Sequence, residues 1–494
     1  MIETHISWVL LTGEYAYKIK KPVDFGFLDF STLARRHFFC TEEVRLNRRF
    51  AASLYLDVVS VTQSGEIARI NGGGDVIEYA VRMHQFPSEQ QLDRLLEADR
   101  ITPTELAEFA GALAEVHASL PACPAGLPFG TAAAAIGPIR ENFAQIRQSS
   151  FGEVRTELVA ALENWSEAQY QRVAPLIDQR RASGFVRECH GDLHLSNLVR
   201  LRDGIHAFDC IEFSEGLRWI DLISDIAFLV MDCLVRGRAD LAYMFLDRYL
   251  ERTGDYAGGA LLGFYLVYRS MVRAKVAALH AQRSDDVESR RRFDAHLDYG
   301  QQRALRARPA MILMCGLSGS GKSWVAQRLI PQLPAVRIRT DVERKRMAGL
   351  APMAGSESPL DAGLYAPQRS DALYAQLARS AGALVSGGER VIVDATFLDA
   401  ARRETFRAES IRQRVPCVIV HCVAPRSVLL ARIEQRSAMH VDPSEATVAV
   451  LDMQLANYQP PSASDAMTLT IDTSQPFDLD AAVRAIEALL ARAG

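Results

Sequence analysis

Residues 310–323 read AMILMCGLSGSGKS, and this stretch decides the fold of the carboxyl-terminal part of the chain. Its first half is a continuous apolar run, which is typical of a buried strand, and a helical pattern begins at Lys322. The glycine-rich segment between them, GLSGSGKS, has the form of a loop that wraps phosphate groups in backbone N–H groups. A glycine turn without a ligand is the alternative, but the order of strand, loop and helix favours the phosphate-binding loop.

The residue types of GLSGSGKS suit an anionic ligand. Glycines let backbone N–H groups close on phosphate oxygens, and the dipole of the following helix favours an anion at its amino end. Lys322 is predicted to reach the outer phosphates, and the hydroxyl of Ser323 is predicted to bind Mg²⁺. The residues expected to bind the nucleotide here are Gly316, Ser318, Gly319, Ser320, Gly321, Lys322 and Ser323.

Beyond this loop, apolar strands alternate with helical segments, which predicts a parallel sheet with crossover helices. Ligands gather at the carboxyl ends of parallel strands. VRIRTD ends in Asp341, with Arg344 one helical turn later, and RVIVDATF carries Asp394 at a strand end. We expect Asp341 and Arg344 to be catalytic, Asp341 as the base for an acceptor hydroxyl, and Asp394 to serve the magnesium ion. A helix N-cap is the alternative role for Asp341.

A later helical segment, APRSVLLARIEQR, places Arg432 and Arg436 on one face. Side chains four residues apart on a helix are neighbours, so both guanidinium groups can reach the same ligand. They are candidates for a catalytic lid that closes over the phosphates. The alternative is a solvated basic helix face.

A second motif of phosphate chemistry lies far upstream, where residues 190–197 read HGDLHLSN. Phosphoryl transfer to a hydroxyl needs a carboxylate at the acceptor and magnesium ligands at the phosphates. Asp192 is the candidate acceptor base. Asn197 is a candidate neutral magnesium ligand, and Asp209, one strand later in HAFDCIEF, is a charged one. The alternative is a loop in which His, Asp and Asn act only as turn formers.

The cation that this second site needs is expected from the strand YAYKIKK near the amino terminus. Lys18 and Lys20 share one face of that strand, while Lys21 faces away. A solvated edge-strand position is the alternative for either lysine. In the helix that follows, Glu43 lies within the inward apolar stripe, so its carboxylate needs a partner. We predict a Lys18–Glu43 pair that serves the nucleotide, with Lys20 as the substitute for Lys18.

The chain divides by pattern into a strand-rich part, a mainly helical part and a part of alternating strands and helices. We therefore expect two domains. The first, residues 1–305, has a small β lobe (about 1–87) and a helical lobe (about 88–305), and the second is residues 306–494. The charged segment before this boundary, SRRRFDAHLDYGQQRALRARP, is expected to be a linker or a docking helix.

Residues 1–300 resemble the aminoglycoside phosphotransferase family, whose fold is a variant of the protein kinase fold. HGDLHLSN, Asp209, the stretch from Glu78-Tyr79 to Phe86-Pro87 and Asp225-Ile226-Ala227 carry the resemblance. It implies an α+β, kinase-like bilobal domain and ATP-dependent phosphorylation of a small molecule at oxygen. It also implies that Asp225 braces the catalytic loop. Cys210 departs from the family pattern, in which an aromatic residue commonly follows the metal aspartate, and this bears on packing more than on chemistry.

Residues 308–494 resemble the small P-loop kinases related to polynucleotide 5′-kinases, gluconate kinases and zeta-type toxins. Asp341 with Arg344, the VIVDAT strand and the arginine-bearing lid carry this resemblance. It implies an α/β P-loop domain that phosphorylates a hydroxyl, while the relatives differ in their acceptors. As a whole the chain looks like a bacterial family that joins a phosphotransferase-like half to a P-loop half.

Composition excludes several classes of protein. A chain of 494 residues is too long for one core, and the 49% hydrophobic and 23% charged residues are ordinary for a soluble protein. The net charge of −4 gives no bulk positive field for nucleic acid or an anionic membrane. Eight scattered cysteines fit reduced thiols, and no apolar run is long enough for a signal peptide or a spanning helix. We expect a cytoplasmic protein.

The leading hypothesis is a bifunctional phosphotransferase that uses ATP and Mg²⁺ at two sites and acts on small-molecule hydroxyl acceptors. One alternative is a regulatory or toxin-like protein in which one half senses ATP and only the other catalyses. The complete set Asp192, Asn197 and Asp209 disfavours an inactive first half. Another alternative is a nucleic-acid 5′-end kinase, which the acidic balance and the lack of a basic, aromatic-interleaved stripe disfavour.

Overall fold

The computed structural model describes residues 1–26, 28–284, 287–305, 307–351, 354, 366–439, 446–462, 465 and 467–493. Contacts divide the chain into two compact units, which we call unit 1 (residues 1–236 and 268–298) and unit 2 (residues 237–267 and 299–494). The predicted domain boundary at 305/306 stays a prediction. The two units that the contacts define are divided at other residues of the chain. Residues 237–267 pack with unit 2 although they precede that boundary.

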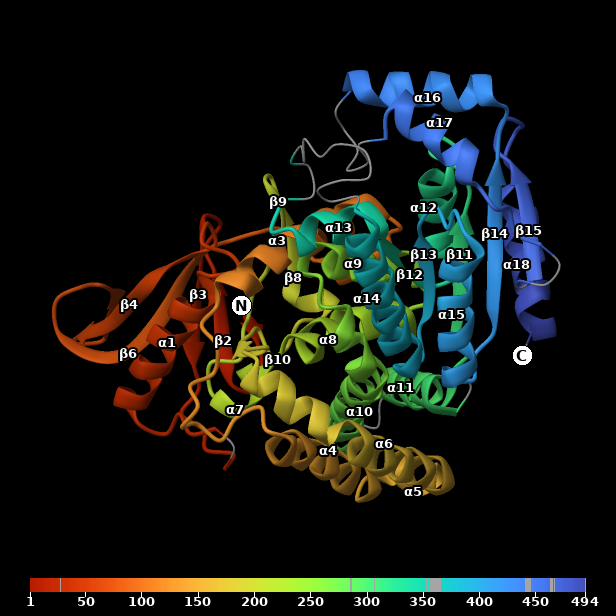
Figure 1. Cartoon of the computed structure of the whole chain (residues 1–494). Coiled ribbons are helices and arrows are strands. Elements are labelled where there is room, and N and C mark those ends of the chain that lie inside the picture. Colours follow the sequence, from red (N-terminus) through yellow and green to blue (C-terminus); the bar gives the residue numbers. More distant parts are fainter. Residues whose placement is uncertain are drawn as a thin grey trace. The chain divides into compact units, whose positions relative to one another are not determined.

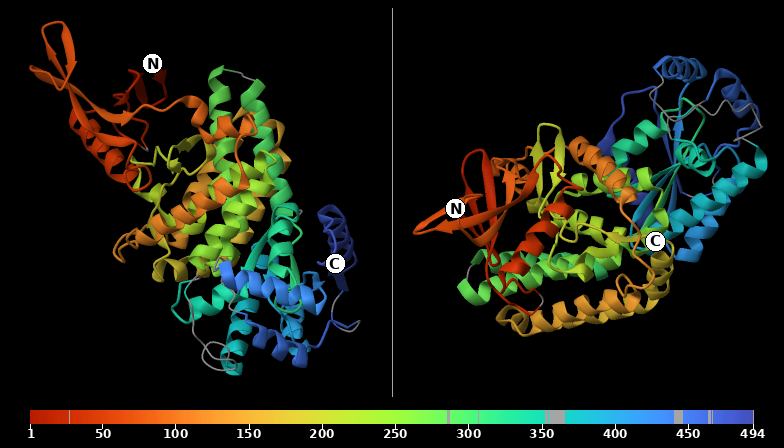
Figure 2. Two further views of the ribbon diagram at one scale, coloured as in Figure 1. Left: turned by 90° about the horizontal axis from the view of Figure 1, so that it is seen from above. Right: turned by 90° about the vertical axis from the view of Figure 1, so that its left-hand side faces the viewer.

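Unit 1 starts with a six-stranded antiparallel sheet in the order β1-β2-β3-β6-β4-β5, with one helix on it. The bounds are β1 (Ile2–Glu3), β2 (Ser7–Leu11), β3 (Tyr15–Lys20), α1 (Leu33–Asn47), β4 (Tyr55–Ser64), β5 (Ile67–Ile70) and β6 (Asp75–His84). Apolar side chains of α1 and of the sheet, such as Cys40, Val44 and Val81, form the core of this lobe. Figure 2 shows β4 and β6 as a long ribbon that extends beyond the other strands.

The rest of unit 1 is helical apart from two small two-stranded sheets, β7 with β10 and β8 with β9. The helices are α2 (Leu92–Glu97), α3 (Pro103–Ser119), α4 (Ala132–Arg147), α5 (Ser150–Val154), α6 (Thr156–Ala182), α7 (Glu215–Arg218) and α8 (Leu222–Val235). The strands are β7 (Val186–Glu188), β8 (Leu198–Leu201), β9 (Gly204–Ala207) and β10 (Trp219–Asp221). Unit 1 thus has a strand-rich part followed by a mainly helical part, while the predicted lobe boundaries stay a prediction.

Two long helices supply residues to both units. They are α10 (Gly259–Ser284) and α11 (Val287–Leu305). Of the segment predicted to be a linker or a docking helix, residues 289–305 lie in α11 and residues 307–309 follow it without helical structure.

Unit 2 is built on a five-stranded parallel sheet in the order β12-β13-β11-β14-β15, which confirms the predicted alternation of strands and helices. The strands are β11 (Ala310–Cys315), β12 (Ala335–Arg339), β13 (Arg390–Asp394), β14 (Cys417–Val423) and β15 (Met467–Asp472). Every residue of the central strand β11 is buried, as its continuous apolar run predicts.

Helices cover both faces of this sheet. Besides parts of α10 and α11, the helices of unit 2 are α9 (Ala239–Thr253), α12 (Lys322–Gln332), α13 (Thr340–Met347), α14 (Pro367–Ser386), α15 (Ala400–Gln413), α16 (Arg426–Met439), α17 (Val448–Asn457) and α18 (Leu479–Ala493). In Figure 1, α14 and α15 lie together over one face, while α12 and α18 pack together on the other. Among the described helices, none is both long and apolar enough to cross a membrane.

Candidate active sites

The HGDLHLSN loop of unit 1 connects β7 to β8 and is fixed by the buried carboxylate of Asp225 in α8. Asp225 accepts hydrogen bonds from the backbone N–H groups of His190 (3.2 Å) and Gly191 (2.8 Å). Arg269 of α10 donates to the carbonyl of Gly191 at 3.1 Å. Gly191 has a φ of 85°, and a Cβ there would lie 2.8 Å from a backbone oxygen. These contacts hold the loop in its observed conformation, in agreement with the brace implied for Asp225.

His117 and Cys189 lie beside Asp225 in the same buried cluster. The Nε2 atom of His117 is 3.3 Å from a carboxylate oxygen of Asp225. Since that carboxylate already holds two backbone N–H groups, the cluster is best understood as part of the brace.

Asp192 and Asn197 meet within the loop. The amide of Asn197 donates to the carboxylate and to the carbonyl of Asp192, at 3.0 Å each. Nε2 of His194 lies 3.3 Å from the Asp192 carboxylate. Burial alone would raise the pKa of Asp192, but His194 and the nearby Arg273 hold that pKa well below its usual range. Asp192 is thus ionised at neutral pH and able to accept a proton.

The predicted Lys18–Glu43 pair is present, with 2.8 Å between Nζ and the carboxylate. Lys18 also forms an ion pair with Asp209. Lys20 contacts the other oxygen of Glu43 at 2.6 Å and pairs with Glu212. Both lysines are therefore paired and buried, and the alternative of a solvated edge strand is wrong for each. Lys18 is the lysine that contacts Asp209.

These contacts set the charge states of the cluster. Burial would raise the pKa of Glu43, but Lys18 and Lys20 lower it to about 2. The pKa of Lys18 is raised well above its usual value, because Asp209 and Glu43 outweigh the effect of its burial. Glu212 was not singled out from the sequence, although its position three residues after Asp209 in an apolar segment could have marked it.

Asp209 has an unusual backbone. Its φ is 63°, its N–H donates to the hydroxyl of Tyr55 at 3.1 Å, and 44% of its side chain is exposed. The next residue, Cys210, is buried and donates its N–H to Asn47 at 2.9 Å. A left-handed conformation at a non-glycine residue costs roughly 1 kcal/mol or more and is common where function requires it. The hydrogen bonds on both sides hold Asp209 in this conformation.

In unit 2, the GLSGSGKS loop joins β11 to α12 and has the backbone shape that its glycines predict. Gly316, Gly319 and Gly321 have φ values of 138°, 80° and 80°. A Cβ at Gly316 would lie 2.3 Å from the carbonyl oxygen of Cys422, and one at Gly319 would lie 2.7 Å from that of Leu429. A residue with a side chain therefore cannot replace Gly316 or Gly319 unless the loop moves.

Lys322 and Asp394 are both buried beside this loop. Nζ of Lys322 donates to the carbonyl of Leu317 at 2.8 Å. Burial lowers the pKa of Lys322, and the charge of Asp394 opposes that effect. Among the described residues, Oδ2 of Asp394 has no hydrogen-bond partner although it is buried. Such an atom is costly unless a ligand or an ion satisfies it.

A cavity of about 620 Å³ opens above the loop. Its lining brings together most of the residues predicted for this site: Ser318, Gly319, Gly321, Lys322, Ser323, Asp341, Arg344, Asp394, Arg432 and Arg436. Gly316 and Ser320, which are buried residues of the loop, do not line it.

The N-cap alternative for Asp341 is wrong. Strand β12 ends at Arg339, which is the N-cap of α13, and Asp341 lies in the first turn of that helix. Arg344, one turn later, donates to the hydroxyl of Ser370 at 3.2 Å. Both side chains line the cavity, so both can meet an acceptor.

The solvated-face alternative for Arg432 is also wrong. Its guanidinium donates to the carbonyl of Gly319 (3.2 Å) and to the hydroxyl and carbonyl of Thr473 (2.8 and 2.7 Å). Arg436 donates to the carbonyl of Ala446 at 3.4 Å. Arg432 thus ties the phosphate-binding loop to the end of β15.

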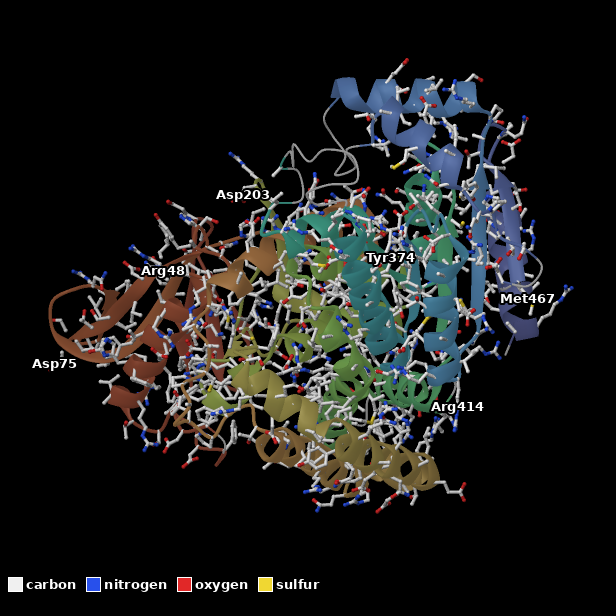
Figure 3. The ribbon with its side chains drawn as sticks, viewed as in Figure 1. Arg48, Asp75, Asp203, Tyr374, Arg414 and Met467 are labelled. Atoms are coloured by element: carbon white, nitrogen blue, oxygen red, sulfur yellow. The ribbon has the colours of Figure 1, made fainter. Side chains whose placement is uncertain are left out.

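Several cavity residues were not singled out from the sequence. Gln454 of α17 accepts a hydrogen bond from the N–H of Ser318 at 2.8 Å. Arg402 of α15 lies over the ring of Tyr374, 4.7 Å from its centroid, and pairs with Asp399 at 3.2 Å. Figure 3 labels Tyr374 on α14. These residues come from separate helices, and no spacing in the sequence connects them.

Comparisons with known proteins find a separate family match for each of the two parts of the chain. Residues 36–262 match the model of the phosphotransferase enzyme family, and residues 311–461 match the model of an AAA domain. The predicted fold class, a kinase-like α+β domain followed by an α/β P-loop domain, is therefore confirmed. Domains of these two kinds use ATP with Mg²⁺, and the chain is a phosphotransferase with two kinase-type domains.

The chain belongs to the same family as a set of mycobacterial proteins. It is 31% identical over 457 residues to the uncharacterized proteins Rv2004c and MT2060 of Mycobacterium tuberculosis and Mb2027c of Mycobacterium bovis. The match covers 92% of this chain and 90% of each relative, so both halves are shared.

Solved structures match with low scores. A gluconokinase from Sinorhizobium meliloti is 24% identical, over 38% of this chain and 94% of its own, with a TM-score of 0.27. A choline kinase from Cryptosporidium parvum is 12% identical, over 61% of this chain and 88% of its own, with a TM-score of 0.35. Scores of this size establish no shared substrate.

Proposed function

We propose that the protein is a bifunctional ATP-dependent phosphotransferase, with one site in each unit and a hydroxyl acceptor at each. The observation that carries this proposal is that each unit holds a complete set of groups for phosphoryl transfer. Unit 1 supplies a base, an amide oxygen, a carboxylate and a lysine from its own residues, and unit 2 supplies a loop, a lysine and two carboxylates. An ATP sensor does not need a base for an acceptor hydroxyl, but each unit has a candidate for one.

The residues of unit 2 fit a nucleotide with Mg²⁺. The loop from Gly316 to Ser323 would cradle the phosphates through its N–H groups, with Lys322 at the outer ones. The hydroxyl of Ser323 and the unsatisfied oxygen of Asp394 would hold Mg²⁺, either directly or through water. The bound ion would neutralise charge on the phosphates.

The residues of unit 1 fit the same pair of ligands. Lys18 would contact the non-transferring phosphates, and Asp209 and Asn197 would hold Mg²⁺. Glu43 keeps Lys18 in place, because a buried lysine needs an ionised partner. Asp192, which is ionised and fixed by Asn197, would take the proton of the acceptor hydroxyl.

In unit 2, Asp341 would take the acceptor proton, and the cavity indicates the class of acceptor. Among the described lining residues, six are cationic (Lys322, Arg339, Arg344, Arg402, Arg432 and Arg436) and three are acidic (Asp341, Asp394 and Asp399). Lys322 and Arg432 lie at the phosphate-binding loop, whereas Arg344 and Arg402 belong to other helices. We therefore propose a small acceptor that carries a carboxylate or phosphate in addition to its hydroxyl.

The test is transfer from γ-labelled ATP to a panel of matched acceptors, for example a hexose beside its sugar acid and its phosphate ester. The full chain and the variants Asp192→Asn and Asp341→Asn are compared. We expect Asp341→Asn to bind ATP normally and to lose transfer to the anionic acceptors only. Equal transfer to neutral and anionic acceptors by the unit 2 site would contradict the acceptor class. Transfer that survives both changes together would contradict the assigned bases.

We also propose that the protein works in the cytoplasm. Its eight cysteines, all within the described residues, are free, and seven of them are buried. Free thiols at this number are usual in reducing compartments.

A further inference from the structure

Helix α9 precedes the P-loop by more than sixty residues in the sequence, yet it packs on the sheet of unit 2. It lies beside β12, the edge strand of that sheet (Figure 1). The carboxylate of Asp247 in α9 accepts a hydrogen bond from the backbone N–H of Arg337 in β12, at 2.6 Å. An edge strand presents N–H groups that the sheet does not pair, and α9 satisfies this one.

An ionic cluster accompanies this hydrogen bond. The guanidinium of Arg337 lies 3.7 Å from Asp247 and 3.5 Å from Glu251, and all three side chains are at least nine-tenths buried. Burial, with the nearby charge of Glu251, raises the pKa of Asp247 to about 6 in spite of Arg337. Asp247 and Glu251 of α9 thus both pair with the guanidinium of Arg337 in β12. These ion pairs hold the helix against the strand.

The end of α9 also holds α13. Arg346 of α13 donates to the carbonyls of Glu251 and, at 3.2 Å, Arg252. The last carbonyls of a helix have no partner within the helix, so these bonds complete α9 while they fix α13. Gly254, which ends α9 with a φ of 72°, leaves room for this contact, because a Cβ there would lie 2.6 Å from Nε of Arg346.

Both contacts act on the part of unit 2 that faces the acceptor. β12 leads directly to Arg339, and α13 carries Asp341 and Arg344. These three side chains line the cavity. A displacement of roughly 1 Å in a reacting group can lower a rate about a hundredfold. A clamp on β12 and α13 therefore controls the geometry of the candidate base.

We propose that α9 is a positioning element of the unit 2 site, with Asp247 and Arg346 as positioning residues that hold Asp341 against the acceptor. This inference rests on the proposed function of that site. It means that the unit 2 site depends on a helix that lies inside the match to the phosphotransferase family, residues 36–262. The match to the AAA domain, residues 311–461, therefore does not contain every element that the unit 2 site uses.

The experiment compares Arg346→Met with Arg412→Met in the full chain. The two arginines are matched, since each pairs with a glutamate three residues earlier on its own helix, Glu343 or Glu409. Only Arg346 also bonds to α9. An Asp192→Asn background removes transfer by the unit 1 site, so transfer from γ-labelled ATP to the anionic acceptors of the panel above reports on the unit 2 site. Calorimetry gives the affinity for ATP, and hydrogen exchange gives the protection of residues 340–347.

We expect Arg346→Met to keep the ATP affinity, to lower kcat roughly tenfold or more and to raise exchange in α13. Arg412→Met should change none of these. Arg346→Lys, which retains a donor, should recover part of kcat. An unchanged kcat and unchanged exchange in Arg346→Met would overturn the proposal, and so would an equal effect of Arg412→Met. Absence of any transfer by the Asp192→Asn parent together with increased exchange in Arg346→Met would contradict the proposed function of unit 2 and leave the clamp standing.

Discussion

The two candidate sites solve the same chemical problem with different parts of the polypeptide. The proposed site of unit 1 is built from charged side chains of segments far apart in the sequence, as in the contacts from Lys18 to Glu43 and Asp209. The proposed site of unit 2 rests mainly on the backbone of one continuous loop. The comparison teaches where each site is vulnerable. Single charges should decide activity in unit 1, and backbone shape should matter as much as charge in unit 2.

The largest effect is expected from Asp192→Asn, which removes the candidate base of unit 1. Its amide can still accept from Asn197, so the loop should keep its shape while transfer by this site falls roughly a thousandfold. The unit 2 site should keep its rate. Asp203→Asn is the control, because Asp203 lies in the turn between β8 and β9, is 64% exposed and is labelled in Figure 3. Acceptor-specific rates of the two variants measure the difference, and a loss in both sites would mean that they are not independent.

Lys322→Ala is expected to have the next largest effect, now confined to unit 2. It removes the buried ammonium group at the phosphate-binding loop and should lower the transfer rate about a hundredfold or more. Transfer by the unit 1 site should stay unchanged. Full activity of the unit 2 site in this variant would show that the loop does not bind the reacting phosphates.

Gly319→Ala tests the role of backbone shape in unit 2. A Cβ at Gly319 would lie 2.7 Å from a backbone oxygen of Leu429. We expect a loss of ATP affinity of roughly tenfold, because the loop must move. Gly349→Ala is the matched control, since Gly349 has a similar positive φ, 72° against 80°, and nothing within 4 Å of an added Cβ. Isothermal titration of ATP into both variants separates the effect of steric contact from that of backbone strain. Equal losses of ATP affinity in the two variants would contradict the steric explanation.

The smallest effects concern pH, and the two units should respond in opposite directions. The pKa of Glu43 falls from 4.5 to about 2 on folding, so its contribution to stability is present above pH 4.5 and is lost as the pH falls toward 2. The pKa of Asp247 rises from 3.8 to about 6, so stability is lost as the pH rises through that range. Thermal unfolding of Glu43→Gln and Asp247→Asn, each compared with the unaltered chain between pH 2 and 7, measures the slope of each residue's stability contribution against pH. The same sign of slope for the two residues would contradict the assigned charge states.

The sequence predicted those features that are encoded locally. The strand, loop and helix around Lys322 follow from hydrophobic pattern and glycine spacing within a few residues, and the structure has them. The Lys18–Glu43 pair was within reach, because strand and helix periodicity place both side chains on inward faces. Opposite-charge pairing then follows from burial alone.

Features that depend on tertiary packing were not predictable in the same way. Glu212 joins Lys20 from a segment nearly two hundred residues away, and Asp247 of α9 bonds to a strand of the other half of the sequence. No periodicity connects such residues. The N-cap alternative to the predicted role of Asp341 as a base is wrong because β12 ends two residues earlier than its sequence pattern suggests. Element ends are where propensity is weakest.

The central claim, that the chain has two nucleotide sites, is tested most directly by the number of ATP molecules bound per chain in the presence of Mg²⁺. Calorimetry of the full chain should give two. Asp209→Ala should remove one, Lys322→Ala should remove or greatly weaken the other, and each change should leave the remaining site nearly unaltered, because distant sites act additively. A stoichiometry of one in the unaltered chain, abolished by Lys322→Ala alone, would contradict the account and leave unit 1 without a nucleotide site.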